Sequence, residues 1–323
     1  MRMLLGLGQG VPFPASAHVV AKWFAPGERG GVTGVYLSGN RLGQAAIGAL
    51  GPALIGAFGW RTFFLFAGLA GFLWLAAWLF SMRWLESSQS TLASPVRMGA
   101  VRPSLNQFLE LLQDRRMAGV FLGYFGYDYA WFLFVTWMPG YLVIERKFGP
   151  QEMAFYSSVP FLAVAFVIIL SGILGDYLVR SGLNEVTVRK SLITAGMLIA
   201  CLIVPAGIVT DNVTSAWLLT LAICGLGIAA PNGWVLTQAI CPKPLVATAT
   251  GIQNFGGNLA GVVAPALTGF IAHKTGSFEL AFTIAGVLLL LGIACYWLLI
   301  PKRSSDGLGE SNLEVTMKTT VTS

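Results

Sequence analysis

Long apolar stretches recur along most of the chain, and they restrict its fold more than any other feature. Each is close to or above the ~20 residues that an α-helix needs to cross the hydrocarbon core of a bilayer, whereas barrel strands would give alternating runs of about ten. Nine such stretches are predicted as membrane spans, at residues 3–21, 31–57, 61–81, 118–142, 153–179, 189–209, 216–240, 245–272 and 279–300.

The composition supports an all-α integral membrane protein. Hydrophobic residues make up 55% of the 323 residues and charged residues 11%, which would leave a soluble domain short of polar surface. The lipid bilayer is therefore an expected partner. The net charge of +6 does not predict nucleic-acid binding, because the basic residues fall between the apolar stretches. We also expect no cofactor and no metal site, since Cys201, Cys224, Cys241 and Cys295 lack metal-ligand spacing.

Basic residues predict the orientation in the membrane. Fourteen of them fall on one side of the predicted spans and only four, Arg61, Arg146, Lys147 and Lys274, fall on the other. Because cytoplasmic loops are rich in Lys and Arg, this asymmetry places the C-terminus in the cytoplasm and Met1 outside. Residues 83–117, which are polar and include an amphipathic piece around 105–112, are predicted as a cytoplasmic linker. Residues 301–323 are predicted as a disordered tail.

An internal repeat divides the chain into two bundles. Residues 6–12, GLGQGVP, match residues 225–231, GLGIAAP, and Thr33-Gly34-Val35 matches Thr250-Gly251-Ile252. Spans one to three therefore repeat as spans seven to nine. We expect residues 1–82 to form three helices of an N-terminal bundle and residues 118–300 a six-helix C-terminal bundle. If the bundles are equivalent, three helices are missing before Gly6, and the nine spans correspond to helices 4–12 of a twelve-helix fold.

Several motifs in this order resemble the anion:cation symporter branch of the major facilitator superfamily, which includes bacterial galactonate, glucarate and hexuronate carriers. They are Arg2 followed by GLGQGVPFPA, then KWFAPGERGGVTG, YDYAWFLFVTWMPGYL, VPFLAVAF with SGILGDYLVRSG, and GIQNFGGNLAG. The resemblance implies a twelve-helix carrier of carboxylated solutes that is coupled to a proton or a sodium ion. It also implies that Arg2 grips the solute carboxylate, although Arg2 could instead be an interfacial residue that reaches toward water.

Three further residues bear on ion coupling. Gln9 stands where proton-coupled relatives carry a glutamate, and an amide cannot exchange protons near neutral pH, so the usual coupling group is replaced. Polar groups deep in a span are costly and are therefore functional candidates, and Arg41 and Asp128 both qualify. Three interpretations of Asp128 stay open. It could carry a coupled proton, pair with Arg41 as a structural or gating contact, or lie solvated in the cavity.

Other site residues follow from the resemblance. Asn40, Tyr124, Trp234 and Asn254 are candidate solute contacts, with packing between helices as the alternative. Glu28 and Arg29, together with Asp176 and Arg180, are candidates for a cytoplasmic gate. The second pair lies in a motif similar to the superfamily's loop motif, whose aspartate caps a neighbouring helix N-terminus. A merely topogenic cluster of charges is the alternative.

The predicted function is secondary active transport of a small organic anion, a sugar acid or another carboxylate, by alternating access across the bacterial inner membrane. The carrier is expected to be monomeric. A truncated nonfunctional remnant, a carrier of a different solute class and a solute sensor built on the same fold are the alternatives. An enzyme is not expected, because clustered catalytic side chains are missing and His18 and His273 are predicted at opposite membrane faces.

Overall fold

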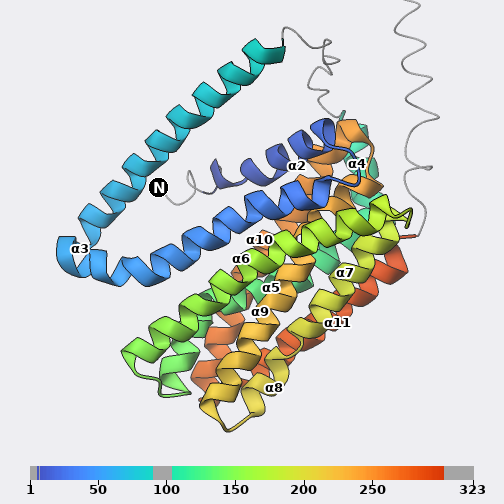
Figure 1. Cartoon of the computed structure of the whole chain (residues 1–323). Helices are drawn as coiled ribbons and strands as arrows, with labels where there is room; N and C mark the ends of the chain where they lie inside the picture. Colours follow the sequence, from blue (N-terminus) through green and yellow to red (C-terminus); the bar gives the residue numbers. More distant parts are fainter. Residues whose placement is uncertain (1–5, 7, 90–103, 302–323) are drawn as a thin grey trace, which may run out of the picture. The chain divides into compact units, whose positions relative to one another are not determined.

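Every regular element in the described part of the chain is helical, as the sequence predicts (Figure 1). The computed structural model describes residues 6, 8–89 and 104–301. Its elements are α2 (Pro12–Trp23), α3 (Arg29–Gln89), α4 (Leu105–Gln113), α5 (Arg115–Ile144), α6 (Pro150–Arg180), α7 (Glu185–Ala200), α8 (Ile203–Ile208), α9 (Asn212–Ile240), the 3-10 turn η1 (Lys243–Leu245), α10 (Val246–Thr275) and α11 (Glu279–Leu299).

Six helices of the described residues are long and apolar enough to cross a membrane. They cover Leu54–Ser81, Gln151–Arg180, Glu185–Ile208, Asn212–Ile240, Lys243–Thr275 and Glu279–Leu299. Five of these six begin and end within four residues of a predicted span, and the sixth, Leu54–Ser81, contains the predicted span 61–81 and begins seven residues before it. The predicted spans at 3–21, 31–57 and 118–142 stay predictions. Glycines dilute the hydropathy of the first part of α3, and α5 begins with two arginines and contains Asp128.

The chain divides into two compact units. The first comprises Met1–Gly43 together with Pro103–Ser323, and the second comprises Gln44–Arg102. The predicted domain boundaries at 82, 117 and 300 stay predictions. Most of the predicted tail and part of the predicted linker lie outside the described residues. The amphipathic piece of the linker forms α4, and a capping box between Ser104 and Gln107 fixes its start.

The second unit is built on the later part of α3, where two predicted spans form one bent element. The bend is at Gly59, whose φ of 76° and ψ of 158° are helix-breaking values that glycine adopts without a steric penalty. Aromatic side chains from both sides of the bend meet, with the Phe58 and Phe66 rings edge to face at 6.5 Å. A small apolar cavity of about 280 Å³ lies among Ile47, Leu54, Phe58, Phe63, Phe66 and Ala67.

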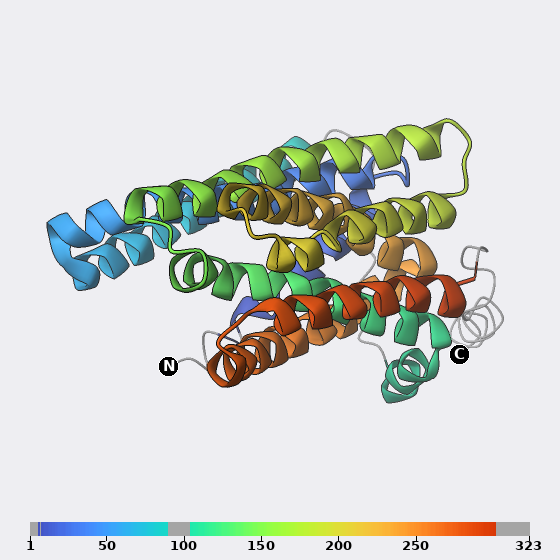
Figure 2. The same cartoon turned by 90° about the horizontal axis from the view of Figure 1, so that it is seen from below.

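The six-helix part of the first unit consists of two groups, as Figure 2 shows. Helices α6, α7 and α9 pack together, and α5, α10 and α11 form the other group. Small residues allow the closest packing: a Cβ on Gly196 of α7 would lie 2.5 Å from the Gly225 carbonyl oxygen of α9. Close backbone approach at such residues is typical of helix pairs in membranes, where the hydrophobic effect does not drive association.

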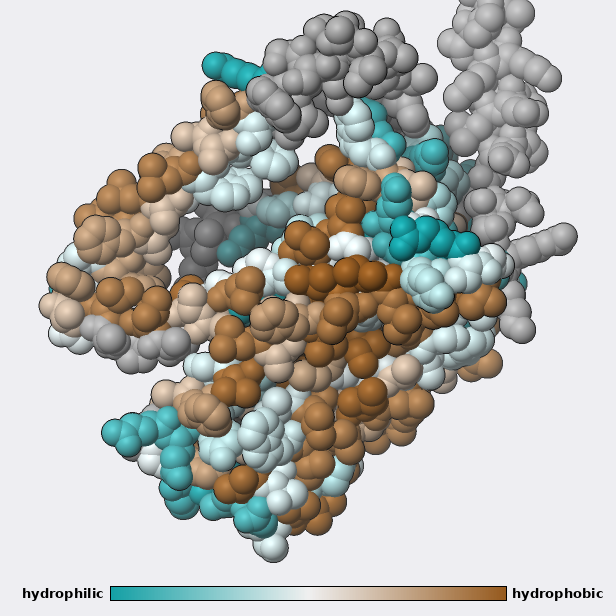
Figure 3. Space-filling view, in the orientation of Figure 1, coloured by the Kyte–Doolittle hydropathy of each residue, from teal (hydrophilic) through white to brown (hydrophobic). Residues whose placement is uncertain are grey.

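The outside of this unit is apolar, as membrane insertion requires. In Figure 3, hydrophobic residues cover the middle of α6 and α7, and hydrophilic residues gather at the two ends of the helices. Large exposed side chains on these helices include Phe166, Leu170 and Leu198. One end carries Lys22, Arg29, Arg180, Arg189 and Lys190, and we refer to it as the basic end. The opposite end contains the α5–α6, α8–α9 and α10–α11 connections.

Candidate functional site

An aromatic cluster joins three helices of the first unit. Trp234 of α9 is buried, and its indole stacks on Phe13 of α2 with ring centroids 5.2 Å apart and planes within 5°. The Tyr124 ring of α5 meets the same indole edge to face at 5.2 Å, and Tyr127 stacks on Tyr124 at 5.3 Å. The structure therefore brings together two predicted site residues, Tyr124 and Trp234. It adds Phe13 and Tyr127, which the sequence analysis did not single out.

Arg41 extends from α3 to α5. Its guanidinium carbon lies 3.5 Å from the centroid of the buried Trp131 ring, and its Nη1 lies 3.5 Å from Oδ1 of the neighbouring Asn40. Stacking of a planar guanidinium on an aromatic face fixes its plane and directs its N–H groups sideways. Arg41 is 12 residues past the start of α3 at Arg29, or about 18 Å along the helix. The cation therefore lies near the middle of a bilayer-length helix.

Asp128 lies beside this arginine. It is 13 residues into α5, about 20 Å from the helix start, and it interacts electrostatically with Arg41. Tyr124, Arg41 and Tyr296 of α11 all lie within electrostatic range of the carboxylate. On α10 the facing residue is Gly257, where a Cβ would overlap the Asp128 carboxylate and stand 2.8 Å from Cε1 of Tyr124. Gly257 thus leaves the space that the carboxyl group occupies.

The remaining predicted solute contacts are less closely associated with this cluster. Asn40 precedes Arg41 and is exposed, and Asn254 is half-buried on α10, where its carbonyl oxygen accepts a hydrogen bond from Asn258 at 2.8 Å. Gln9 is exposed in the helical segment that precedes α2. Arg2 lies outside the described residues.

Asp176 links three helices at the basic end. Its two carboxylate oxygens accept hydrogen bonds from the backbone N–H groups of Gly30 at 2.9 Å and Gly31 at 2.6 Å, in the first turn of α3. Those N–H groups have no partner within their own helix, and the helix dipole there favours a negative charge. Arg189 of α7 pairs with the same carboxylate at 2.6 Å and also donates to Oδ1 of Asn232 on α9 at 3.1 Å.

The other predicted gate residues surround the short turn between α2 and α3. Arg29 is buried and donates to the carbonyl oxygens of Phe24 at 3.2 Å and Ala21 at 3.3 Å, so it satisfies the end of α2. Glu28 accepts from the Ala25 N–H at 3.2 Å. Arg180 lies against Gly27, where an added Cβ would stand 2.7 Å from its Cγ. All four candidates therefore lie at this end of the first unit.

Glycines make the α3–α6 contact at this end. A Cβ on Gly172 of α6 would overlap the carbonyl group of Gly30, and a Cβ on Gly34 would stand 2.9 Å from the carbonyl oxygen of Ile168. The two backbones therefore touch without intervening side chains. This proximity allows the Asp176 carboxylate, one turn beyond Gly172, to reach the start of α3.

Two polar residues of this network were not predicted from the sequence. Asn232 is fully buried and uses both ends of its amide: it accepts from Arg189 and donates to Oγ of Ser171 at 2.8 Å. Glu185 interacts electrostatically with Arg189, Arg29 and Asp176. The sequence does contain a signal for Asn232, because a polar amide directly after Pro231 lies inside an apolar span, where such groups are costly.

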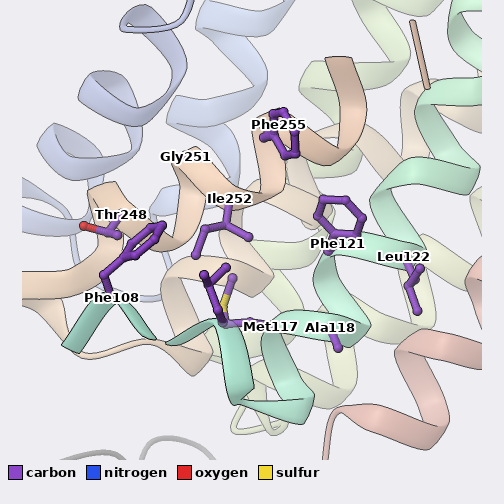
Figure 4. A pocket seen from close by; sticks show the side chains of 10 residues that line it. Phe108, Met117, Ala118, Phe121, Leu122, Thr248, Gly251, Ile252 and Phe255 are labelled. Atoms are coloured by element: carbon purple, nitrogen blue, oxygen red, sulfur yellow. The ribbon is translucent and has the colours of Figure 1, made fainter. Parts of the chain in front are cut away.

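A groove elsewhere in the first unit is of a different kind. It has a volume of about 810 Å³ and lies between α4, α5 and α10, with Phe108, Met117, Phe121 and Phe255 around it (Figure 4). Its lining is apolar apart from the hydroxyl of Thr248. Because a carboxylate needs charged or N–H donors when it leaves water, this groove does not suit an anionic solute. The cluster around Arg41 offers a charged group with N–H donors of this kind.

Comparisons with known proteins agree with this architecture. The family model described as Major Facilitator Superfamily matches residues 1–265 and 183–320. The "Probable galactarate/D-glucarate transporter GarP" of Escherichia coli strain K12 is 30% identical over 315 residues, which cover 92% of this chain and 70% of that protein. The "D-galactonate transporter" of Escherichia coli O6:H1 is 28% identical over 316 residues, covering 93% and 73%.

A third relative and a solved structure are also similar to this chain. The "Hexuronate transporter" of Bacillus subtilis strain 168 is 30% identical over 299 residues, covering 89% of this chain and 69% of that protein. The crystal structure of a bacterial homologue of the iron transporter ferroportin in the outward-facing state aligns with a TM-score of 0.67 at 16% identity, over 90% of this chain and 69% of that one. That likeness concerns the fold alone. The chain belongs to the major facilitator superfamily of membrane transporters, and it resembles the members that are named for sugar acids rather than any enzyme.

Proposed function

We propose that this protein carries a small organic anion, a sugar acid or a related carboxylate, across the bacterial inner membrane by alternating access. The observation that supports it best is Arg41, a cation held near the middle of the bilayer-length helices against Trp131 and beside Asp128. A charge at that depth is costly, and ionisable residues inside membrane spans are therefore typical of binding and transport sites. The printed names of the relatives, which concern galactarate, D-glucarate, D-galactonate and hexuronate, favour an acidic sugar.

The chemistry of the cluster fits such a solute. A guanidinium binds a carboxylate through two parallel N–H donors, and Arg2, by resemblance, is the first of these anchors. The indole of Trp234 and the ring of Tyr124 offer flat apolar faces to the C–H side of a sugar chain. Asn40, Asn254 and Gln9 are neutral donors and acceptors suited to hydroxyl groups.

Coupling to a cation is assigned to Asp128. Gln9 cannot exchange protons, so a carboxyl group elsewhere must do so if the coupled ion is a proton. Asp128 is half-buried, its carboxylate lies against Gly257, and it is beside the cation Arg41, so its charge and its proton both affect the solute site. A sodium ion is the other candidate for the coupled cation.

Alternating access requires a contact that opens and closes at one membrane face. The network around Asp176 joins the start of α3 to α6 and α7, and we assign to it the closed state of the basic end. The positive-inside rule makes this end cytoplasmic, with the C-terminus on the same side. Glu28, Arg29 and Arg180 belong to this gate.

The experiment that tests the function uses the purified chain in proteoliposomes. Exchange of radiolabelled D-glucarate or D-galactonate against the same unlabelled acid is measured first, and then accumulation driven by an imposed pH or sodium gradient. Transport predicts exchange with at least one of these acids. Absence of exchange with every acid supplied would contradict the proposed function and favour a nonfunctional remnant.

The variant Asp128→Asn tests the coupling. It is expected to retain exchange and to lose accumulation driven by the pH gradient, because the amide cannot carry a proton. Glu279→Gln makes the same chemical change at an exposed position and should behave as the wild type. If Asp128→Asn accumulates solute as well as the wild type does, Asp128 is not the proton carrier.

A further inference from the structure

The groove between α4, α5 and α10 has no part in the proposed function, because its lining is almost entirely apolar. Its volume of about 810 Å³ is typical of a ligand site. We infer that this groove binds an anionic phospholipid, with an acyl chain along the apolar lining and the phosphate among basic side chains at the basic end. The inference goes beyond the proposed function and does not depend on which solute is carried.

The groove has room that the side chains of its three helices do not fill. An added Cβ on Gly251, in the lining, would meet nothing within 4 Å. Phe108 and Phe255 also line the groove, and they are 37% and 65% exposed. Lipid tails are as apolar as leucine, so an acyl chain can cover these side chains without leaving a polar group unpaired.

Helix α4 places one wall of the groove at the membrane surface. Its residues Leu105, Phe108 and Leu112 recur along one face of the helix, and all three are exposed. An amphipathic helix of this kind lies in the interface, with its apolar face below the headgroups. Glu110 is two residues from Phe108 and from Leu112, so at about 100° per residue it lies on the opposite face. This acid therefore does not repel an anionic lipid in the groove.

Polarity along α10 changes in the order that a phospholipid requires. Lys243 is exposed in η1, directly before α10, and Thr248 follows in the first turn of the helix. Phe255 is nine residues past the helix start at Val246, or about 14 Å further along. Figure 4 shows Thr248 at one end of the groove, where its hydroxyl is the polar group of the lining. A cation, a hydroxyl group and hydrocarbon thus match a phosphate, a glycerol ester and an acyl chain.

Helix α5 supplies a second basic residue. Arg115, the first residue of α5, is exposed. Ala118 and Leu122 of the lining follow it by three and seven residues, so all three lie on one face of the helix. Because a helical side chain leans toward the N-terminus of its helix, the guanidinium of Arg115 lies at the end of the groove and not within it.

The two basic residues lie at the same end of the groove. Cys241, two residues before Lys243, interacts electrostatically with Arg116 and Asp114 at the start of α5. The start of α5 therefore lies beside the segment that leads into α10. Arg116 pairs with Asp114 at 2.9 Å, so this carboxylate is already neutralised. Arg115 and Lys243 add positive charge that favours an anionic headgroup.

Native mass spectrometry of the purified full chain tests the inference. The delipidated protein in detergent is titrated with phosphatidylglycerol or with phosphatidylcholine, both carrying palmitoyl and oleoyl chains, and the bound lipids are counted. We expect phosphatidylglycerol to bind about 5- to 25-fold more tightly, because each of two basic residues favours its negative charge by about fivefold. Equal affinities for the two lipids overturn the inference, and so does a chain that retains no phosphatidylglycerol.

The double variant Arg115→Gln with Lys243→Gln tests the headgroup contacts. Binding of phosphatidylglycerol should weaken by about 5- to 25-fold, whereas binding of phosphatidylcholine should change by less than about threefold. Lys274→Gln is the matched control, since Lys274 is exposed at the other end of α10. Phosphatidylglycerol binding that is equal in the double variant and in the wild type overturns the inference.

The variant Gly251→Leu tests the position of the acyl chain. Its side chain would occupy the groove, so binding of both lipids should fall by at least about tenfold. Gly68→Leu in α3, where an added Cβ also meets nothing within 4 Å, is the control and should bind as the wild type does. Unchanged lipid binding in Gly251→Leu overturns the assignment to this groove. If Gly251→Leu does not fold, the exposed charge variants still decide whether the inference stands.

Discussion

Asp176 on α6 and Arg189 on α7 form a buried ion pair, with 2.6 Å between Oδ1 and Nη2. The same carboxylate also accepts from the N–H groups of Gly30 and Gly31, so one side chain neutralises a buried cation and caps a helix. Each role requires the negative charge.

Asp176→Asn should therefore destabilise the protein strongly. The amide leaves Arg189, which has no exposed surface, without its counter-charge, and breaking a buried pair in this way costs about 3–5 kcal/mol. The change is measured as the shift of the thermal unfolding midpoint in detergent. Glu110→Gln, an equivalent change on an exposed face of α4, should stay within about 0.5 kcal/mol. Similar shifts for both variants would refute the role of the pair.

Gly172→Ala should disturb the α3–α6 contact. Its Cβ would overlap the Gly30 carbonyl group, and relief of such overpacking costs about 1–3 kcal/mol. The control is Gly251→Ala in α10, where a Cβ meets nothing within 4 Å and the better helix propensity of alanine should stabilise by up to about 1 kcal/mol. Thermal unfolding compares the two, and stabilisation by both substitutions would contradict the close contact.

Trp234→Phe should report solute binding at the aromatic cluster. The smaller ring loses part of the stacking with Phe13 and Tyr124, so affinity should fall about two- to tenfold. Most of the solute-induced change in tryptophan fluorescence should also disappear. Trp217→Phe removes an indole that is 45% exposed on the same helix and should leave both signals unchanged. If Trp217→Phe loses both signals and Trp234→Phe keeps them, the solute does not bind at Trp234.

Arg146→Gln should destabilise the end of the bundle opposite the basic end. The buried guanidinium donates to the hydroxyl of Tyr141 at 2.6 Å and to the carbonyl oxygen of Ala206 at 2.8 Å. Loss of such charged hydrogen bonds costs about 1.5–3 kcal/mol. The neighbouring Lys147 is exposed, and Lys147→Gln should change the unfolding midpoint little. The unfolding midpoint of Arg146→Gln should therefore be clearly lower than that of Lys147→Gln, and equal midpoints would contradict the role of Arg146 at this end.

Local sequence patterns predict the helices well because membrane spans need about 20 apolar residues wherever they occur. The same rule explains why the breaks and bends within helices were not predicted. The break between α7 and α8 at residues 201–202 falls inside an apolar stretch, so hydropathy gives no sign of it. The chain contains 39 glycines, and nothing in the local sequence singles out Gly59 as the one at which α3 bends.

The candidate site is harder to predict because its contacts join distant segments. Arg41 and Trp131 are 90 residues apart in the sequence, and Arg189 and Asn232 are 43 apart. The sequence indicates that a polar residue within a span is significant, but it does not indicate its partner. The resemblance supplied Tyr124, Trp234 and Asp176, whereas Phe13, Trp131 and Asn232 required the packing of the helices.

The Asp176 contact also determines which substitutions can release it. Its partners on α3 are two backbone N–H groups, which every residue except proline possesses. The side-chain chemistry of α3 therefore cannot abolish the bonds, although bulk at Gly30 can push the helix away. A random screen for carriers locked open at this face should recover charge changes at positions 176 and 189, and on α3 only prolines and enlarged glycines. At this shared contact, α3 therefore tolerates most side-chain substitutions, whereas α6 does not tolerate a change of charge at Asp176.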